Sequence, residues 1–498
     1  MKKIFFIIPF CILLFFNLYS SKDNIIYVRT IDSTYIEPGK AVDFYSDEVI
    51  SNIFEGLVRF KKGTLIIEAC LATSWEVNDN GKRWTFKLRK GVKFHNGEIF
   101  DARAVKKSFK KRMGKYRSEY KKSEHLFSSL KDIKVINRHT VEIVLNKTYA
   151  PFLSTLTDTA ASIIAPSCYN NSHFKPIGTG PFKFEKWEKG KFLIIKRNEF
   201  YWDGKVELSK VIFKIVKNPY TKFLYIKNNM ADVSKIRSAK EYDEFKGDKE
   251  VKFLLSPSCS VHYLAFNTKK EPFNKVEIRR AFCHLIDKKM LIRHVFQNLA
   301  IPAVTLIPQH LFGFNKKIVD YDYNIEKAKE LLKKFGLVKG FKCSLFYEKT
   351  NIALNKIANI LKEKAKALNI VIKKIALPLN EMIKRVNTGQ HDMVLIGWVA
   401  GPDPDIFFHP TLTIRKENKN RFYYDNPEYI LTLKKARETL QKEKRIKLYE
   451  RAQEIIHDDA PWNPLFHLKS IIVCNKKVRN LYINPNGYLI FKNAIKAE

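Results

Sequence analysis

SWEVNDNGKRWTFKLRKGVKFHNGE, residues 74–98, carries the clearest folding signal in the chain. Apolar and polar residues alternate on both sides of the turn sequence Asn78-Asp79-Asn80-Gly81. Alternation with a period of two places every second side chain on one face of a strand, and Asn-Gly favours tight hairpin turns. We therefore predict an antiparallel hairpin here. Val92 and Phe94 predict a further strand, which Asn96-Gly97 closes.

The same hairpin pattern recurs in the first half of the chain, and the pattern changes in the second half. Residues 132–153 predict two short strands that end at Pro151, and residues 177–202 predict another hairpin. After residue 270, apolar residues recur at helical spacing between short strands. The predicted helices are 276–296, 325–335, 352–368, 427–441 and 443–458, and the predicted strands are 342–347, 370–375 and 392–396. These halves together predict an α/β protein of two lobes with an extra subdomain.

The charge of the chain is strongly positive, with 90 Lys and Arg against 51 Asp and Glu and a net charge of +39. A field of this sign attracts acidic ligands, polyanions and anionic membrane surfaces. The densest basic segment, RAVKKSFKKRMGKYRSEYKK at 103–122, has apolar residues at helical spacing, so its lysines are expected on a solvated helix face. Polyanion binding is the alternative. Because the motifs of nucleic-acid-binding folds are missing, we expect no nucleic-acid partner.

Catalytic motifs are also missing from the sequence. There is no nucleophile elbow, no zinc-protease helix and no phosphate-binding glycine loop. The histidines are isolated, and the paired carboxylates Asp458 and Asp459 stand at a predicted helix end before Ala460-Pro461. We therefore expect no enzymatic activity, no cofactor and no metal site.

Residues 1–21 have the features of a secretory signal peptide. Lys2 and Lys3 precede an apolar run from Ile4 to Phe16, and small residues follow at positions 20 and 21. As a helix this run spans about 20 Å, too short for a bilayer core of about 30 Å. An uncleaved anchor is the alternative. We expect an exported periplasmic protein, soluble or peripherally associated with the inner membrane. In an oxidising compartment the six later cysteines permit a disulfide but do not require one.

Six blocks of sequence, in order along the chain, carry a family resemblance. They are IFEGLVRF (53–60), LATSWEVNDNGKRWTFKLRKGVKFHNGEIFDARAVKKSF (71–109), PIGTGPFKFEKWEKGKFLIIKRNEFYW (176–202), YLAFNTKKEPFNKVEIRRAFCHLIDKKMLI (263–292), YNIEKAKELLKKFG (323–336) and YERAQEIIHDDAPWNPLF (449–466). Together they resemble the extracytoplasmic solute-binding proteins of ABC importers, specifically the oligopeptide- and dipeptide-binding group, family 5. The resemblance covers nearly the whole chain after the export segment.

This resemblance implies a two-lobed, periplasmic-binding-protein-like fold of type II with an inserted subdomain. The implied regions are lobe I at 22–65, 176–265 and 470–498, the inserted subdomain at 66–175, and lobe II at 266–469. Chain crossings near 265 and 470 would form a hinge, and the lobes would close over cargo in the cleft between them. The family also implies a monomer that delivers its cargo to the membrane permease subunits of an ABC importer.

The stretch VLIGWVAGPDPDIFF, residues 394–408, matches the strand that reaches the cleft in this family. The resemblance implies that the backbone of Gly397, Trp398 and Val399 pairs with the main chain of the ligand like an added strand. Gly397 would let the ligand approach closely, Trp398 would form an apolar wall, and Val399 would supply its N–H and C=O. The alternative for Trp398 is an ordinary core aromatic.

A second wall of the cleft is implied near the N-terminus. IEPGKAVDFYSDEVISNIFEGL, residues 36–57, aligns with the family pattern in which the stretch after an acidic residue and a proline lines the cleft. That alignment nominates Phe44 and Tyr45 as ligand-binding residues. The alternative is that both rings are merely packed.

The sequence departs from the peptide-binding pattern at one position. Peptide-binding relatives usually place an Asp three residues after the tryptophan, where it pairs with the α-ammonium of the peptide, whereas position 401 here is Gly. Asp403 or Asp405 is the candidate substitute. A cleft without a carboxylate would lose about 1.5–3 kcal/mol of charge-assisted binding. We predict a receptor for short peptides; the alternatives are a non-peptide cargo (a nickel complex, haem, glutathione, an opine or an oligosaccharide) and, less favoured, polyanion binding.

Overall fold

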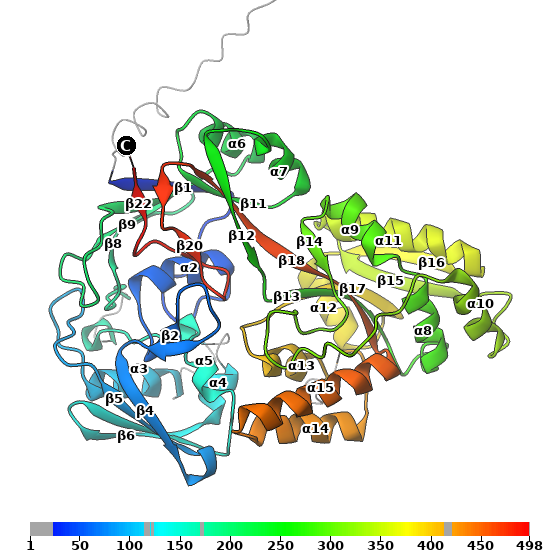
Figure 1. Cartoon of the computed structure of the whole chain (residues 1–498), viewed down its shortest axis with the longest axis horizontal. Coiled ribbons are helices and arrows are strands. Elements are labelled where there is room, and N and C mark those ends of the chain that lie inside the picture. Colours follow the sequence, from blue (N-terminus) through cyan, green and yellow to red (C-terminus); the bar gives the residue numbers. More distant parts are fainter. Residues whose placement is uncertain (1–22, 114–119, 121–123, 170–173, 413–420, 498) are drawn as a thin grey trace, which may run out of the picture. The chain divides into compact units, whose positions relative to one another are not determined.

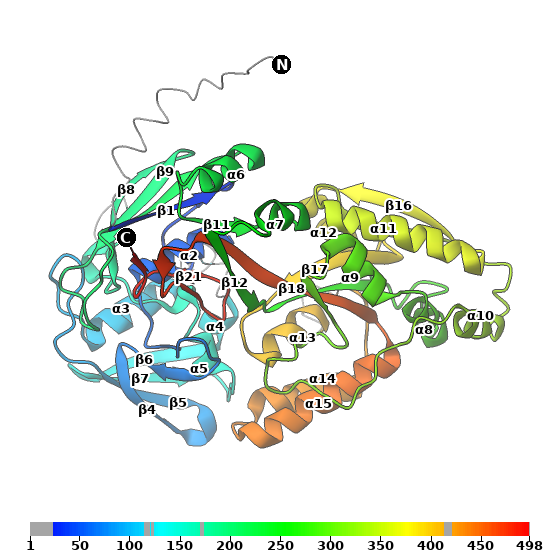
Figure 2. The same ribbon diagram turned by 45° about the horizontal axis from the view of Figure 1, so that its top comes forward.

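The computed structural model describes residues 23–113, 120, 124–169, 174–412 and 421–497 (Figures 1 and 2). The predicted export segment, residues 1–21, lies outside them. The chain divides into two compact units, which are considered one at a time. Unit 1 is formed within Met1–Lys147, Phe152–Ser256 and Ser470–Glu498, and unit 2 within Thr148–Pro151 and Pro257–Lys469. The division into three regions that the resemblance implies stays a prediction.

The main sheet of unit 1 has the strand order β18-β11-β1-β10-β9-β8. Its strands are β1 (Asn24–Arg29), β8 (Phe182–Glu188), β9 (Phe192–Arg197), β10 (Lys210–Ile215), β11 (Val233–Ile236) and the last residues of the 14-residue β18 (Trp462–Asn475). β1 runs parallel to β10 and β11, and the other neighbours are antiparallel. β8 and β9 form the hairpin predicted at 177–202, which confirms that prediction.

A smaller four-stranded antiparallel sheet contains the first predicted hairpin. Its order is β4 (Ala72–Asn78), β5 (Arg83–Leu88), β7 (Thr140–Leu145) and β6 (Leu130–Asn137). Trp75 pairs with Phe86, and the turn uses positive φ at Asp79, Asn80 and Gly81, so the Asn-Gly interpretation is confirmed. The further strand predicted at Val92 and Phe94 is wrong, because pairing there is limited to a bridge between Lys93 and Ile99.

Helix α2 (Phe44–Ile53) joins the N-terminal and C-terminal parts of unit 1. The side chain of Asp43 caps its first turn. Asn52 donates its side-chain amide to the carbonyl of Leu489 over 2.9 Å and accepts from the backbone N–H of Phe491 over 3.0 Å. These buried hydrogen bonds attach α2 to the C-terminal segment that contains Leu489 and Phe491. α2 therefore holds its first residues in a defined position.

The remaining elements of unit 1 are helices and strands outside the paths of these two sheets. They are β2 (Val58–Phe60), β3 (Ile67–Ala69), α3 (Ala102–Met113), α4 (Glu124–Ser129), α5 (Phe152–Thr155), α6 (Pro219–Lys227), α7 (Ala239–Phe245), β12 (Val251–Pro257, which ends in unit 2), β19 (Val478–Arg479), β20 (Tyr482–Ile483), β21 (Leu489–Ile490) and β22 (Ile495–Lys496). α3 is the first part of the predicted basic helix, and most of that segment beyond Met113 lies outside the described residues.

Unit 2 is built around a mixed sheet in the order β16-β15-β17-β13-β18, with β14 also paired to β18. The strands are β13 (Ser260–Phe266), β14 (Ala300–Pro302), β15 (Lys342–Glu348), β16 (Val371–Leu377), β17 (Met393–Val399) and the first residues of β18. β15 is parallel to both β16 and β17, whereas β13 is antiparallel to β17. Leu264, Phe282, Leu345, Ile357 and Leu395 belong to one buried core beneath this sheet.

The helices of unit 2 are α8 (Val276–His284), α9 (Lys288–Phe296), α10 (Ile325–Lys333), α11 (Ile352–Ala365), α12 (Leu379–Asn387), α13 (Pro404–Leu412), α14 (Pro427–Glu438) and α15 (Lys442–Asp459). The helix predicted over 276–296 is in fact two helices. The helix is interrupted before Lys288, because the side chain of Asp287 accepts from the N–H of Met290 and caps the start of α9. In the described part of the chain, no helix combines the length and the apolar character needed to cross a bilayer.

Candidate functional site

The end of strand β17 has an unpaired side. β17 pairs with β13 along its whole length, from Met393 to Val399, but with β15 only from Met393 to Leu395. No described strand pairs with the β15 side beyond Leu395. The predicted binding residues, 397–399, lie in this open segment, so their backbone forms a sheet edge within unit 2.

The direction of the backbone groups follows from the pairing register. The N–H of Ala400 donates to the carbonyl of Cys259 over 2.8 Å and continues the ladder with β13. In an antiparallel pair, successive residues bond alternately to one side and to the other. Trp398 therefore bonds to β13, whereas Gly397 and Val399 direct their N–H and C=O groups to the open side. Gly397 and Val399 can therefore hydrogen-bond to an added strand through their backbones, whereas the backbone of Trp398 is already paired with β13.

The side chains of the tripeptide have different surroundings. A Cβ atom at Gly397 would lie 2.5 Å from Nε2 of His262, whose ring stacks on Phe466 at 4.7 Å. The lack of a side chain at position 397 thus makes room for His262, a reason that the sequence does not reveal. Trp398 is partly buried and donates Nε1–H to the carbonyl of Ile406 over 3.1 Å. Val399 is 72% exposed.

The acidic residues after the tripeptide form buried ion pairs. Asp403 is 1% exposed, and both of its oxygens accept from Arg445, over 2.6 and 3.1 Å. Asp405 is 2% exposed and accepts two hydrogen bonds from Arg437, over 2.7 and 3.1 Å. The role of Asp403 in pairing with an ammonium stays a prediction. Its bidentate pair with Arg445 counts against that role, because a ligand would have to open it.

Phe44 and Tyr45 lie at the start of α2 in unit 1. Tyr45 is 9% exposed, and the guanidinium of Arg29 lies 5.3 Å from its ring centre, so Tyr45 is largely packed. Phe44 is partly exposed and packs against Tyr488 at 5.2 Å. The ammonium of Lys235 lies 3.6 Å from the ring centre of Phe44. Of the two predicted residues, Phe44 therefore has the more accessible face.

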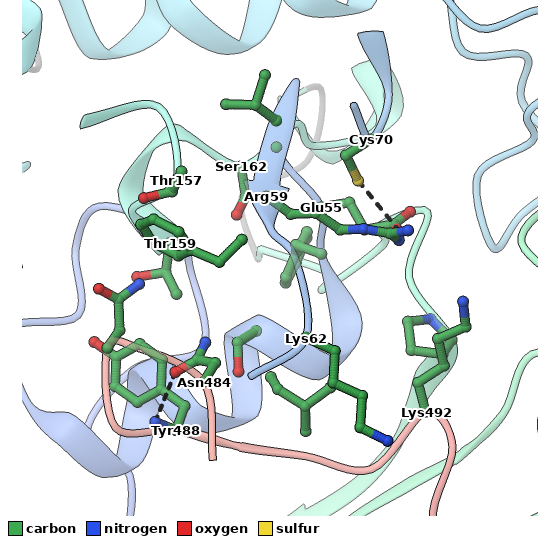
Figure 3. A pocket seen from close by; sticks show the side chains of 18 of the residues that line it. Glu55, Arg59, Lys62, Cys70, Thr157, Thr159, Ser162, Asn484, Tyr488 and Lys492 are labelled. Atoms are coloured by element: carbon green, nitrogen blue, oxygen red, sulfur yellow. Dashed lines mark hydrogen bonds between the residues drawn. The ribbon is translucent and has the colours of Figure 1, made fainter. Parts of the chain in front are cut away.

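Unit 1 also contains a pocket of about 190 Å³, shown in Figure 3. It lies among α2, β2 and the C-terminal strands β20 and β21. Its charged side chains have partners: Glu55 accepts from Tyr201 over 2.7 Å, and Arg59 donates to Glu68 and Asp203 over 2.9 and 2.8 Å. Burial raises the pKa of Glu55. None of the six predicted binding residues is among the described residues that line this pocket.

Comparison with known proteins decides the family. Residues 67–419 match the family described as bacterial extracellular solute-binding proteins, family 5 Middle. The chain belongs to this family. It is a substrate-binding protein of an ABC importer and not an enzyme, so both of these predictions are confirmed. The family is extracellular or periplasmic, in line with the coarser part of the predicted location.

Several relatives resemble this family 5 protein over nearly its whole length. Heme-binding protein A of Haemophilus influenzae is 30% identical over 95% of this chain and 92% of its own. The dipeptide-binding protein of Escherichia coli is 30% identical over 89% and 88%. The structure of the periplasmic binding protein DppA of Helicobacter pylori in complex with peptide STSA has a TM-score of 0.80 and 29% identity, over 95% of this chain and 98% of that chain. The predicted periplasmic-binding-protein fold is thereby confirmed.

Proposed function

We propose that this protein captures short peptides in the periplasm and delivers them to the membrane permease subunits of an ABC importer. The observation that supports the proposal best is the open edge of β17, where Gly397 and Val399 direct N–H and C=O groups away from β13. An extended peptide carries the complementary groups at the same spacing along its main chain. Phe44 and Trp398 would contact its side chains, and hinge closure of the two units would enclose it.

Main-chain pairing suits a receptor that accepts many sequences. Each hydrogen bond to the peptide backbone contributes about 0.5–1.5 kcal/mol net, and it does so whatever side chain the peptide carries. Cargo selection is then left to the few side chains that contact the ligand. The similarity to a dipeptide-binding protein and to a peptide-bound structure supports the same cargo class.

A non-peptide cargo is the second candidate, and one observation favours it. Both carboxylates near the tripeptide, Asp403 and Asp405, are held by arginines, which leaves no free acid there for the ammonium of a peptide. A relative of comparable identity is a heme-binding protein. Cargo without an amino terminus would have no need of such a carboxylate.

Identification of the bound cargo tests the proposal directly. Protein purified without denaturation is expected to release a peptide of a few residues, in a ratio approaching one per chain, when it is unfolded in acid. Mass spectrometry identifies the released species, and repeated incubation with the same peptide should return it uncleaved. Release of a non-peptide compound in that ratio would contradict the peptide proposal and favour the second candidate.

Substitution of Val399 by proline tests the role of the open edge. Proline lacks the N–H that points to that edge, and edge strands tolerate proline where the N–H faces away from the ladder. We expect peptide affinity to fall about tenfold, the size of one hydrogen bond, with a change of less than about 1 kcal/mol in unfolding free energy. Isothermal titration with the identified peptide measures the first quantity, and urea denaturation measures the second.

The matched control is Val399→Ala, which removes most of the same side chain and keeps the N–H. It is expected to bind the peptide within about threefold of the parent. Equal binding by the proline and alanine variants would show that the N–H of residue 399 contributes nothing to capture.

A further inference from the structure

Lys235 of unit 1 lies against the predicted binding residue Phe44, and its ammonium has no acidic partner among the described residues. Lys235 is in β11, and its Nζ lies 3.6 Å from the ring centre of Phe44. In the described part of the chain, its ammonium has no carboxylate within 4.0 Å and no hydrogen-bond acceptor. Its backbone carbonyl accepts from Lys222 over 3.1 Å. The residue as a whole is partly exposed.

Two carboxylates of this region, Glu48 and Glu241, are committed to other groups. Glu48 is fully buried, lies 3.8 Å from Arg29, and accepts from the N–H of Leu489 over 3.0 Å. Glu241 is held by Lys222 over 3.2 Å. Neither acid contacts the ammonium of Lys235, although Glu48 acts on it at longer range. Among the described residues, the ammonium of Lys235 is therefore left without a carboxylate in contact.

The surroundings of Phe44 give this place its shape. β11 lies beside β18 in the main sheet (Figure 1). In this pairing Lys235 lies opposite Ile472. The turn at Gly487 lies next to the Phe44 ring, because a Cβ atom at that position would be 3.4 Å from Cε2 of Phe44. Arg237 comes directly after β11, is exposed, and donates to the hydroxyl of Thr30 over 3.3 Å. The Phe44 ring thus packs against Tyr488, and the ammonium of Lys235 lies over it.

The incomplete solvation of the Lys235 ammonium also favours an anionic ligand. Burial lowers the pKa of Lys235 to about 8, so the ammonium is still mostly charged at pH 7 although it is incompletely solvated. The ring offers a cation–π contact, which offsets part of the lost hydration. A carboxylate would offset the rest through a charge-assisted hydrogen bond. The net charge of +39 adds a long-range attraction for acidic cargo.

We propose that Lys235, held against Phe44, is the residue that selects cargo bearing a carboxylate, by forming an ion pair with that group. This inference rests on the proposed function for its cargo site, and it extends that function by naming the chemical group that unit 1 recognises. The carboxylate is either the C-terminus of a peptide or an acidic side chain. The position was missed from the sequence because a lysine in a short strand, ADVSKIR, gives no sign of which ring it covers.

Four proteins purified in parallel test the inference: the parent, Lys235→Met, Lys235→Arg and the control Lys240→Met. Methionine keeps the length of the side chain without its charge, arginine restores the charge, and Lys240 is an exposed lysine of the nearby helix α7. The released cargo is expected to contain an acidic group. The Lys235→Met protein should retain at most a tenth of the amount found on the other three. Equal retention by Lys235→Met, or a cargo without an acidic group, would overturn the proposal.

Titration with defined probes locates the carboxylate. Trialanine should bind the parent ten- to a hundredfold better than trialanine amide if the C-terminus pairs with Lys235, and the difference should vanish in Lys235→Met. If an acidic side chain pairs instead, the same loss should appear between Ala-Glu-Ala amide and Ala-Gln-Ala amide. Ratios that are unchanged by Lys235→Met in both pairs would overturn the proposal. An acidic cargo that is not a peptide would contradict the proposed function and leave this inference standing.

Discussion

Replacement of Arg445 by methionine is expected to lower the free energy of unfolding by about 3–5 kcal/mol. Arg445 donates to both oxygens of Asp403 and also to the hydroxyl of Tyr449 over 2.9 Å. Its side chain is 8% exposed and that of Asp403 is 2% exposed. Removal of the guanidinium would leave a buried carboxylate without a compensating charge, which proteins tolerate poorly. Urea denaturation followed by circular dichroism at pH 7 measures the loss.

An exposed ion pair of the same unit provides the control. Arg451 contacts Glu428 over 2.7 Å, and their side chains are 50% and 57% exposed. Arg451→Met is expected to cost less than about 1 kcal/mol, because solvent screens such pairs. A loss in Arg445→Met no larger than that of the control would contradict the structural role of the buried pair.

The double variant Arg445→Met with Asp403→Leu separates stability from binding. It removes both charges together, so most of the lost stability should return. If Asp403 also pairs with the amino group of a peptide, this stable variant should still bind about ten- to a hundredfold more weakly than the parent. Affinity equal to that of the parent would show that Asp403 supports the loop and does not contact the cargo.

Acidification from pH 6.5 to pH 4 is expected to destabilise the protein strongly. Burial lowers the pKa of four histidines to about 4: His95, His262, His391 and His467. Their pKa in the unfolded chain is about 6.5. As the pH falls through this window, the unfolded chain binds protons that the folded chain does not, so the stability present above pH 6.5 is progressively lost. The loss reaches up to about 3 kcal/mol per histidine at pH 4, since one pKa unit corresponds to 1.36 kcal/mol.

His391 is the most informative of the four to replace. It is fully buried, and neither ring nitrogen has a hydrogen-bond partner among the described residues. His391→Phe should flatten the dependence of urea midpoint on pH between 6.5 and 4, whereas the exposed His294→Phe should leave it unchanged. Burial also raises the pKa of Glu48 and Glu55, which opposes the trend because the folded chain binds those protons first. A parent midpoint that stays constant down to pH 4.5 would contradict the prediction.

Local patterns in the sequence predict the elements of this fold well where the deciding residues are neighbours. The hairpin around Asn80 and Gly81 is specified by its own turn and by alternation on both sides. The helices α11, α14 and α15 follow from apolar spacing within single segments. The strand predicted near Val92 fails because the residues around it make one bridge only, and alternation alone does not supply a partner strand.

The candidate site depends on partners far apart in the chain, which limits prediction from the sequence. The pattern around Trp398 predicts a strand end, but the register with β13 and β15 decides which backbone groups lie on its open side. Asp403 is a conspicuous acid in the sequence, yet its partner Arg445 lies 42 residues away. Gly397 and Phe44 likewise depend on His262 and Lys235, which no local spacing connects to them. Family resemblance nominates Gly397, Phe44 and Asp403 without giving their contacts.

The cysteines of the described residues can report local opening of the folded protein through their reaction with a thiol reagent. All six are buried thiols outside any disulfide, three in unit 1 (Cys70, Cys168, Cys474) and three in unit 2 (Cys259, Cys283, Cys343). A thiol reagent can reach each of them only when the surrounding structure opens, and it leaves a permanent mass tag. The pattern of tagged cysteines then shows which unit opens first, without any engineered label. Closure over cargo, if it steadies one unit more than the other, would be recorded in the same pattern.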